Sequence, residues 1–357
     1  MNLGFFMMPL HPPAKPRTQC FDEDVELAVL AEKYGFTEGW IGQHLSNSWE
    51  PIPSSDLFIA HVLARTRSIR LGGAVTLVPQ HHPVNAALRL AFLDHLSHGR
   101  LNCAFGQGGT PNDWELFDLP DPKTQGLMTV EGVDMILKLW QAEAPFDFQG
   151  RFWHIKMEHT IKELGVGEML RPYQQPHPPI GMSVIKENSL AGRMAGQRGY
   201  MPISSNLVPS STVARHWPLY CAGAEEAGRP SPDRSIWRVS RTVFVAESSQ
   251  EAWDYALGGT FYDSYKYLTT LMKSVEMSHL MKTDPGMPDA ELTPEYFIRN
   301  VCIVGNVREC IDQLQSLKQE TGGFGTLLMI THDWDDKAKW LHCMELLANQ
   351  VVPALSR

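Results

Sequence analysis

The chain has 357 residues and a formal net charge of −9, with 43% apolar and 20% charged residues. This balance is typical of a soluble globular protein, and the acidic charge argues against nucleic-acid binding, which needs a basic surface. No apolar run is long enough to span a membrane and the N-terminus lacks the basic start of a signal peptide, so we expect a cytoplasmic protein. The six cysteines lack C-x-x-C spacing, which predicts free thiols and no metal site.

Short apolar segments alternate with helical patterns along the chain. Strands are predicted at residues 3–8, 39–42, 69–75, 101–105, 180–185, 200–203, 237–246 and 325–330. Helices are predicted at residues 23–34, 54–64, 84–96, 130–140, 188–197, 210–227, 306–317 and 340–351. Eight strands joined by helices predict an α/β fold, a (β/α)8 TIM barrel, as a single domain over residues 1–357.

Three segments interrupt or follow this alternation. Residues 142–177 carry charges and several glycine or proline breaks, and we expect an insertion that packs over the barrel. Residues 273–294 contain Asp284-Pro285-Gly286-Met287-Pro288, which cannot continue a helix, so we predict a mobile lid there. The acidic run at residues 333–336 follows the last predicted strand and is interpreted as a solvated surface.

Polar or glycine-rich residues follow several predicted strands. His44 ends the run Trp40-Ile41-Gly42-Gln43-His44, and Gly106-Gln107-Gly108-Gly109 follows a later strand. Because the carboxyl ends of barrel strands form the site in such folds, a ligand site is predicted there. Taken alone, His44 could equally be a core histidine, and the glycines could serve only to turn the chain.

The predicted strand at 180–185 runs into Lys186-Glu187-Asn188-Ser189, where a helix begins. Backbone N–H groups at the start of a helix bind phosphate, which predicts a phosphate site at this loop. Ordinary helix capping would explain Asn188 or Ser189 equally well. His81 and His82 precede a proline after the third predicted strand, and their adjacent side chains diverge too far to share one metal ion.

These strand ends make the chain resemble the bacterial luciferase-like flavin monooxygenases over nearly its whole length, most of all the limonene and diketocamphane monooxygenase branch. The matching stretches are Gln43-His44, Ile52-Pro53-Ser54-Ser55-Asp56-Leu57-Phe58, His81-His82-Pro83, Leu93-Asp94-His95-Leu96-Ser97-His98-Gly99-Arg100-Leu101, Leu170-Arg171-Pro172-Tyr173-Gln174 and Thr321-Gly322-Gly323-Phe324-Gly325-Thr326-Leu327-Leu328. The resemblance implies a barrel that takes reduced FMN from a separate NAD(P)H:flavin reductase. It also implies O2 as co-substrate, activated as a flavin C4a-peroxide that oxygenates a small apolar or aromatic substrate. A homodimer is expected.

The resemblance also assigns residues. His44 matches the family's active-site histidine, expected to act as an acid or base that titrates near neutrality. Ala74-Val75 matches a turn against the flavin ring that is often a cis peptide, and Asn188 with Ser189 matches the phosphate loop. The expected flavin contacts are Ala74, Val75, Thr76, Gly106, Gln107, Gly108, Val184, Ile185, Lys186, Asn188 and Ser189. Residues expected to line the mouth toward substrate are Phe5, Phe6, Trp40, Trp49, His81, His82 and Tyr262.

The chain departs from the family pattern at three positions. Family members often carry Glu where this chain has Gln43, so His44 is expected to lack that charged partner. In luciferase itself a cysteine stands at the position of Gly106 and a phosphate-binding arginine at that of Gln107, which argues against a light-emitting reaction. Two alternatives remain open: an oxidoreductase that uses the deazaflavin F420 on the same barrel, and a non-catalytic flavin-binding protein.

Overall fold

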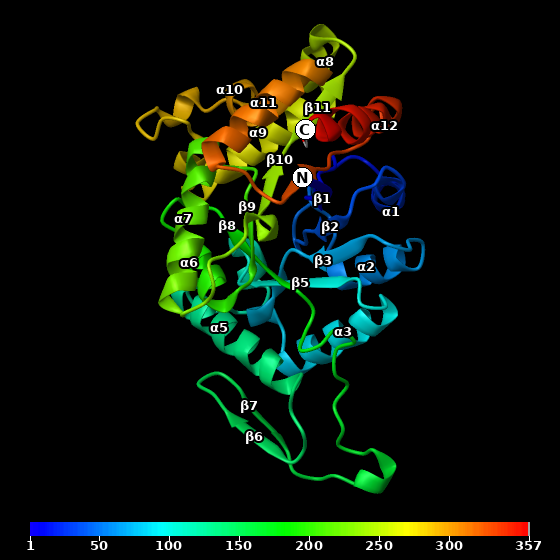
Figure 1. Cartoon of the computed structure of the whole chain (residues 1–357), viewed down its shortest axis with the longest axis vertical. Helices are drawn as coiled ribbons and strands as arrows, with labels where there is room; N and C mark the ends of the chain where they lie inside the picture. Colours follow the sequence, from blue (N-terminus) through cyan, green and yellow to red (C-terminus); the bar gives the residue numbers. More distant parts are fainter. Residues whose placement is uncertain (356–357) are drawn as a thin grey trace.

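The computed structural model describes residues 1–355, and its centre is a closed barrel of eight parallel strands (Figure 1). Each strand pairs in parallel with the next, and the β1–β13 and β3–β5 pairings close the ring. Around the barrel the strands are β1 (Asn2–Met7), β2 (Glu38–Ile41), β3 (Arg70–Gly73), β5 (Leu101–Gly106), β8 (Ile180–Val184), β9 (Met201–Ser204), β10 (Arg238–Arg241) and β13 (Thr326–Ile330). The short strand β4 (Thr76–Leu77) pairs in parallel with the carboxyl end of β5. The predicted (β/α)8 barrel is confirmed.

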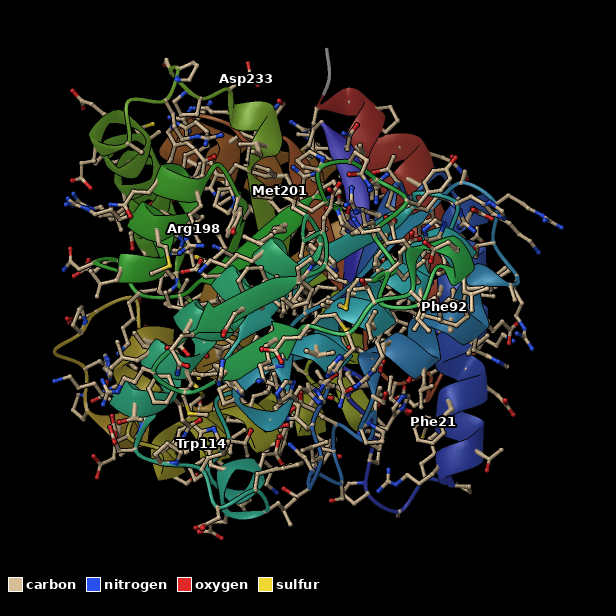
Figure 2. The ribbon with its side chains drawn as sticks, turned by 90° about the horizontal axis from the view of Figure 1, so that it is seen from below. Phe21, Phe92, Trp114, Arg198, Met201 and Asp233 are labelled. Atoms are coloured by element: carbon tan, nitrogen blue, oxygen red, sulfur yellow. The ribbon has the colours of Figure 1, made fainter. Side chains whose placement is uncertain are left out.

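Helices cover the outside of the barrel, and local signals set their ends. His82 precedes α3, and its Nδ1 accepts the Val84 N–H at 3.3 Å. Asn306 and Glu309 make reciprocal capping bonds at the start of α11. Figure 2 shows Phe92 of α3 and Arg198 of α6 at opposite sides of the view. The barrel helices are α1 (Arg17–Lys33), α2 (Ser55–Leu63), α3 (Pro83–Leu96), α5 (Pro122–Leu139), α6 (Leu190–Arg198), α7 (Ser210–Glu226), α11 (Val307–Thr321) and α12 (Lys337–Leu346), followed by α13 (Val352–Ala354). The short helix α4 (Pro111–Glu115) lies in the loop after β5.

Side chains fill the amino end of the barrel. Arg238 Nη2 lies 2.9 Å from Glu38 Oε2, and the Trp40 indole N–H donates to Glu38 Oε1 at 2.9 Å. Trp40 and Leu328 are fully buried in the barrel interior. At the carboxyl ends of the strands, in contrast, the residues that follow β3 and precede the loop after β5 are half-exposed. The barrel therefore opens at the carboxyl ends of its strands.

The strand predicted at 237–246 is two strands in the structure. β10 stays in the barrel, whereas β11 (Val243–Ala246) pairs in parallel with β12 (Ile303–Asn306) in a separate two-stranded sheet. Between β11 and β12 the chain forms α8 (Ser249–Ala256), α9 (Gly259–Ser274) and α10 (Pro294–Val301). The sequence pattern could not show the division, because every residue of β11 is as buried as those of the barrel strands.

The insertion predicted at residues 142–177 projects from the barrel instead of packing over it. It contains the antiparallel hairpin β6 (Phe146–Gln149) and β7 (His154–Met157), at the bottom of Figure 1. The Glu131 carboxylate on α5 accepts the N–H groups of Phe152 and Trp153 at 2.8 and 3.1 Å. The hairpin turn is thus fixed to α5 and not to the mouth of the barrel.

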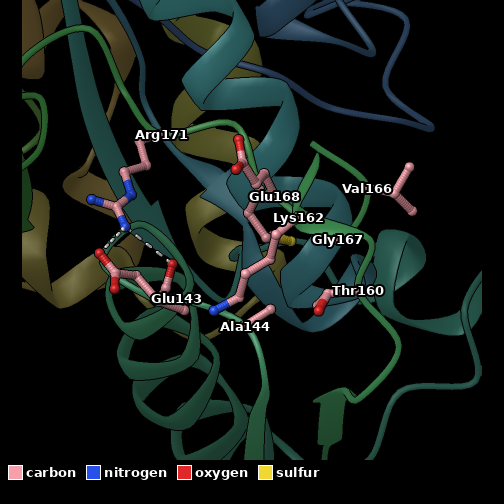
Figure 3. A pocket seen from close by; sticks show the side chains of 10 residues that line it. Glu143, Ala144, Thr160, Lys162, Val166, Gly167, Glu168 and Arg171 are labelled. Atoms are coloured by element: carbon pink, nitrogen blue, oxygen red, sulfur yellow. Dashed lines mark hydrogen bonds and ion pairs between the residues drawn. The ribbon is translucent and has the colours of Figure 1, made fainter. Parts of the chain in front are cut away.

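A cavity of about 490 Å³ lies between the end of α5 and the rest of this insertion (Figure 3). Its walls carry Glu143, Lys162, Glu168 and Arg171, and Arg171 Nη2 lies 3.1 Å from Glu143 Oε1. Both of these paired side chains are largely exposed. Because α5 runs antiparallel to the barrel strands, its last turn, and this cavity with it, lies at the amino end of the barrel.

The segment at residues 273–294, where the mobile lid is predicted, begins at the end of α9 and contains two short 3-10 helices, Ser278–Met281 and Asp289–Glu291. Lys282 Nζ donates to the Met287 carbonyl at 2.6 Å, and the side chains of Met281 and Leu292 are fully buried. Its exposed tip is the turn at residues 283–288. In the described part of the chain, no helix combines the length and apolar character needed to cross a membrane.

Candidate active site

The structure brings the predicted site residues of four neighbouring strands together. His44 follows β2, Ala74–Thr76 follow β3, Gly106–Gly108 follow β5 and Lys186–Ser189 follow β8. These strands are consecutive around the barrel, so their carboxyl ends lie side by side. The predicted active-site histidine, the flavin floor and the phosphate loop therefore share one end of the barrel.

His44 lies among polar partners from two loops. Its Nε2 is 3.2 Å from Glu50 Oε2, and its Nδ1 is 3.1 Å from Thr110 Oγ1 and 3.7 Å from Asp113 Oδ2. Glu50 and Asp113 are almost fully buried, whereas the His44 side chain retains 26% of its exposure. The His44 ring is thus partly open to solvent and held by two carboxylates, and it is not part of the buried core.

The charge of His44 follows from these contacts. Burial alone lowers its pKa, but Glu50 and Asp113 outweigh that effect and raise the pKa from 6.5 to about 10. The ring is therefore a cation at neutral pH, able to donate a proton from either nitrogen. The expectation of a group that titrates near neutrality is wrong for this chain.

The expectation that His44 lacks a charged partner is also wrong. Gln43 does not contact the ring: its Oε1 accepts the Ser55 N–H at 3.2 Å and the Ser55 hydroxyl at 2.8 Å, at the start of α2. The negative charge comes instead from Glu50 and Asp113, neither of which was selected from the sequence. A usable signal was present, since Glu50 stands in the apolar context Trp49-Glu50-Pro51-Ile52, where a carboxylate needs a partner.

The surface beside His44 is made of small residues. The Ala74–Val75 peptide is cis, as the resemblance implied. A Cβ placed on Gly106 would lie 2.6 Å from Val75 Cγ2, and Gly108 has a φ of 86° that favours glycine. Phe6, Ala74 and Val75 are half-buried and pack against the same interior cluster, which includes Trp40 and Leu328. This half-exposed floor without large side chains fits the flat face of a ring system such as a flavin.

The phosphate loop has the donors that the sequence predicted. Ser189 is the N-cap of α6, and its Oγ accepts the Ala191 N–H at 3.2 Å. Within residues 1–355 the Ser189 hydroxyl donates to no other group, so its hydrogen remains available to a phosphate oxygen. Lys186 and Asn188 are exposed beside it. Hydroxyl, amide, ammonium and helix-start N–H groups form a donor set suited to a phosphate dianion.

Several predicted substrate residues lie elsewhere. Phe5 and Trp40 are fully buried, Phe5 against Gly39 and Trp40 inside the barrel, so neither offers surface to a substrate. His82 caps α3, as described above, and His81 lines a small cavity behind Gln43 and Thr76. Burial and the nearby Arg89 lower the pKa of His81.

The two remaining aromatic candidates belong to the region of α9. Trp49 stacks on Tyr267, with ring centroids 5.2 Å apart, and borders a groove of about 520 Å³ along α9. Tyr262 is a half-buried residue of α9 packed against the main hydrophobic core.

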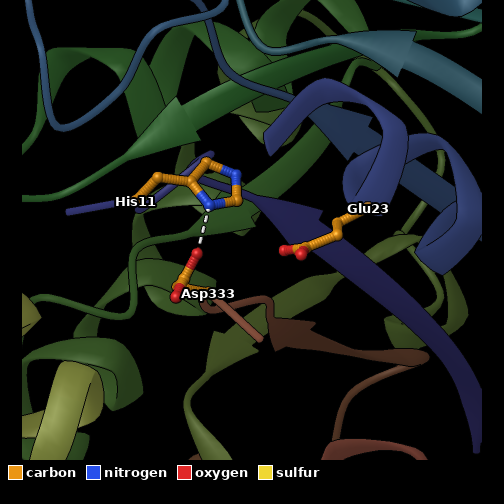
Figure 4. Close-up of side chains that lie close together, drawn as sticks. All are labelled: His11, Glu23 and Asp333. Atoms are coloured by element: carbon orange, nitrogen blue, oxygen red, sulfur yellow. Dashed lines mark hydrogen bonds and ion pairs between the residues drawn. The ribbon is translucent and has the colours of Figure 1, made fainter. Parts of the chain in front are cut away.

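A second group of ionisable residues lies near the carboxyl ends of β1 and β13 (Figure 4). His11 Nδ1 is 2.6 Å from Asp333 Oδ1, and His11 Nε2 is 3.0 Å from Asp24 Oδ2. Lys15 Nζ lies 2.6 Å from Asp333 Oδ1 and also pairs with Glu23. Although His11, Glu23 and Asp333 could together reach one metal ion, Lys15 already supplies a positive charge between the two carboxylates.

This cluster corrects the interpretation of residues 333–336 as a solvated run. Asp333 is 2% exposed, and Trp334 is also buried. Burial lowers the pKa of His11, but its bonds to Asp24 and Asp333 outweigh that effect and raise it from 6.5 to about 9. Asp336 is the N-cap of α12, since its carboxylate accepts the Lys339 N–H.

The comparisons with known proteins agree with this fold. The sequence model of the family described as luciferase-like monooxygenase matches residues 1–323. The chain is 33% identical to the 4-hydroxyprotoasukamycin monooxygenase of Streptomyces nodosus subsp. asukaensis, covering 99% of this chain and 92% of that protein. It is 28% identical to the 3,6-diketocamphane 1,6-monooxygenase of Pseudomonas putida, covering 99% of this chain and 98% of that one.

Solved structures extend the likeness to three dimensions. The oxygenating constituent of 3,6-diketocamphane monooxygenase from Pseudomonas putida, a type II Baeyer-Villiger monooxygenase solved with FMN, superposes with a TM-score of 0.90. The two chains are 29% identical, and the match covers 99% of this chain and 98% of that one. The chain belongs to the luciferase-like monooxygenase family and is an enzyme of that class.

Proposed function

We propose that this protein is the oxygenase of a two-component system that uses reduced FMN and O2 to oxygenate a small apolar or aromatic substrate. The observation that carries the proposal is the juxtaposition of His44, the floor formed by Ala74, Val75 and Gly106, and the donor loop that ends at Ser189. A flat ring, a phosphate and an acid are accommodated at one barrel mouth. The FMN bound in the diketocamphane monooxygenase structure and the oxygenase names of the relatives support this choice.

Each part of the site has a role in this proposal. Ser189, Asn188 and Lys186 would hold the FMN phosphate, and the cis Ala74–Val75 turn with Gly106 would support the ring. When bound, reduced FMN would supply the electrons needed for O2 to give one oxygen atom to the substrate and the other to water. The chain itself binds and orients the flavin and donates a proton from His44, which Glu50 and Asp113 keep charged.

The reductant is proposed to come from a separate NAD(P)H:flavin reductase. Within residues 1–355, the segments outside the barrel are the hairpin insertion, the β11–β12 sheet and their helices. The oxygenase-component and oxygenating-constituent names of relatives support a separate reductase. Reduced FMN would then reach the open barrel mouth by diffusion or by transient contact. A cytoplasmic location, where such reductants and reduced thiols persist, completes this part of the proposal.

A homodimer is proposed from the exposed apolar side chains of two neighbouring helices. Leu57 of α2 is 72% exposed, and Phe92 and Leu96 of α3 are 55% and 48% exposed. α2 and α3 pack against each other, so these side chains can form one surface. An apolar surface of this kind is common where subunits meet. Sedimentation of the purified protein tests this part: a monomer at micromolar concentration would contradict it.

The experiment that tests the proposed chemistry compares reductants. The purified protein is mixed anaerobically with photoreduced FMN, with reduced F420, or with oxidised FMN, and O2 is then admitted with a panel of small cyclic substrates. The proposal expects oxygenated product with reduced FMN alone. Hydride transfer from reduced F420 without O2 would instead establish an F420-dependent oxidoreductase. Tight binding of oxidised FMN without turnover would establish a non-catalytic flavin-binding protein.

A further inference from the structure

Tyr267 connects α9 to the paired side chains of Glu50 and His44 at the barrel mouth. Its hydroxyl donates to Glu50 Oε1 at 2.8 Å, while the other oxygen of Glu50 lies 3.2 Å from His44 Nε2. Asn47 contacts the same hydroxyl and also donates to Glu50 Oε1 at 3.3 Å. The Tyr267 ring is fixed in turn by the stack on Trp49, with an angle of 13° between the planes. These contacts lead from a helix outside the barrel to His44.

The two carboxylate oxygens of Glu50 have different partners. Oε1 receives the neutral donors Tyr267 and Asn47, which leaves Oε2 facing the imidazole. The Glu50 side chain is only 4% exposed, so water cannot easily replace a lost donor. A carboxylate held on one side by neutral donors keeps a single orientation toward the histidine.

We propose that Tyr267 is a positioning residue for the reaction: its hydroxyl holds Glu50 so that Glu50 keeps His44 protonated and oriented at the mouth. The proposal deepens the proposed function, because His44 is the acid of that site. It assigns a role to α9, which lies outside the barrel and carries none of the flavin contacts proposed here. Tyr267 itself does not touch the reacting atoms.

The other groups that face His44 define what Tyr267 does not control. Asp113 reaches Nδ1 from α4, and its carboxylate is anchored separately by the Ser46 N–H at 3.0 Å and the Leu45 N–H at 3.3 Å. Thr110 contacts Nδ1 from the loop after β5. Loss of the Tyr267 hydroxyl should therefore weaken the Nε2 side of His44 and leave the Nδ1 side unchanged.

The test is the titration of His44 in the full chain without flavin, followed by NMR of ring-labelled histidine and assigned by comparison with His44→Gln. Tyr267→Phe keeps the ring and its stack on Trp49 but removes the hydroxyl. The titration midpoint of His44 should fall by about one pH unit, the scale of weakening one nearby opposite charge. Tyr255→Phe is the matched control, because its hydroxyl also donates to a carboxylate, that of Asp335, which is not among the groups that face His44.

A double-mutant cycle decides whether the effect passes through Glu50. Tyr267→Phe should no longer move the His44 midpoint in the Glu50→Gln background. If Tyr267→Phe fails to fold, Glu50→Asp replaces it, since the shorter side chain cannot reach both Tyr267 and His44. A midpoint that is unchanged or raised in Tyr267→Phe, or an equal shift with and without Glu50, overturns the proposal.

A kinetic readout separates positioning from general destabilisation. If reduced FMN supports turnover, Tyr267→Phe should lower kcat about tenfold with little change in KM for reduced FMN, because the flavin contacts are unaltered. A rise in KM with kcat unchanged contradicts the proposal. If the parent protein shows no turnover with reduced FMN, the proposed function fails, while the His44 titration still decides the role of Tyr267.

Discussion

Glu50 Oε2 lies 3.2 Å from His44 Nε2, and this pair determines what the histidine can do. With Asp113 on the opposite nitrogen, the imidazole keeps its proton well above neutral pH. His44 is therefore set up to donate a proton and not to accept one. The main difference between the expected site and the observed one is that His44 was expected to titrate near neutrality, whereas its carboxylate partners keep it charged there.

His44→Ala should reduce turnover with reduced FMN on the order of a hundredfold, as expected when a general acid is removed. The fold and flavin binding should remain, because His44 is partly exposed and lies outside the phosphate loop. Steady-state turnover and the dissociation constant of reduced FMN measure the two effects. His154→Ala, an exposed histidine of the β6–β7 hairpin, is the matched control. Near-parental turnover in His44→Ala would reassign the residue to structure.

The pH profile should show an acid with a raised pKa. The kcat/KM for reduced FMN reports the free enzyme, so a requirement for protonated His44 keeps it constant at neutral pH and lowers it as pH rises through about 10. Glu50→Gln removes one of the two carboxylates that raise the pKa, so the decline should begin at lower pH. An identical profile in Glu50→Gln would show that the pair does not control the acid.

Ser189→Ala should weaken binding of reduced FMN by about 1 kcal/mol, roughly a fivefold rise in the dissociation constant, the scale of one hydrogen bond to a charged group. Ser248→Ala removes an equivalent N-cap, that of α8, and should lower stability without changing FMN affinity. Anaerobic fluorescence titration measures both variants. Equal FMN affinity in Ser189→Ala and the parent would remove this loop from the site.

Stability should depend on pH through His11. Its pKa is about 9 in the folded protein and 6.5 when unperturbed, so its bonds to Asp24 and Asp333 stabilise the fold fully below pH 6.5. This contribution, on the order of 3 kcal/mol, should disappear as pH rises through about 9. Urea unfolding of the parent and of His11→Gln over this pH range isolates the contribution of His11, because any pH dependence due to His44 is the same in both proteins. If the free energy of unfolding changed with pH in the same way in the parent and in His11→Gln, His11 would not be the source of this pH dependence.

Shortening the tip at residues 284–287 tests the lid. The cut leaves Met281 and Leu292 in the core, so the fold should be retained. If the segment excludes water from the mouth, FMN binding should stay intact while more hydrogen peroxide is released for each product molecule. The control shortens the exposed loop at residues 230–232, between α7 and β10 at the amino end of the barrel. An unchanged ratio of peroxide to product would show that the tip shields nothing.

The barrel itself was predictable from the sequence because each strand carries its own apolar pattern and each helix its own boundary signals. The division of residues 237–246 between β10 and β11 was not predictable, since both strands are buried and β-forming, and only their partners differ. Phe5 and Trp40 could not be separated from mouth residues either. Alternation along a strand gives two faces, but it does not show which layer of the barrel a side chain occupies.

The site was predictable where function depends on neighbouring positions in sequence, and not where it depends on distant ones. Ser189 was found because a helix start follows a strand directly. Asp113 and Tyr267 lie far from His44 in the sequence, and no local pattern joins them to it. Asp333 was misassigned for the same reason: its partners His11 and Lys15 are at the other end of the chain.

The most direct test of the proposed function uses isotopically labelled O2. The protein is given photoreduced FMN anaerobically, and labelled O2 is admitted together with a substrate that the reductant comparison has identified. Mass spectrometry of the product should show one labelled oxygen atom per molecule, with none incorporated from labelled water under unlabelled O2. A product that carries no label from O2, or one formed equally well without reduced FMN, would contradict the account.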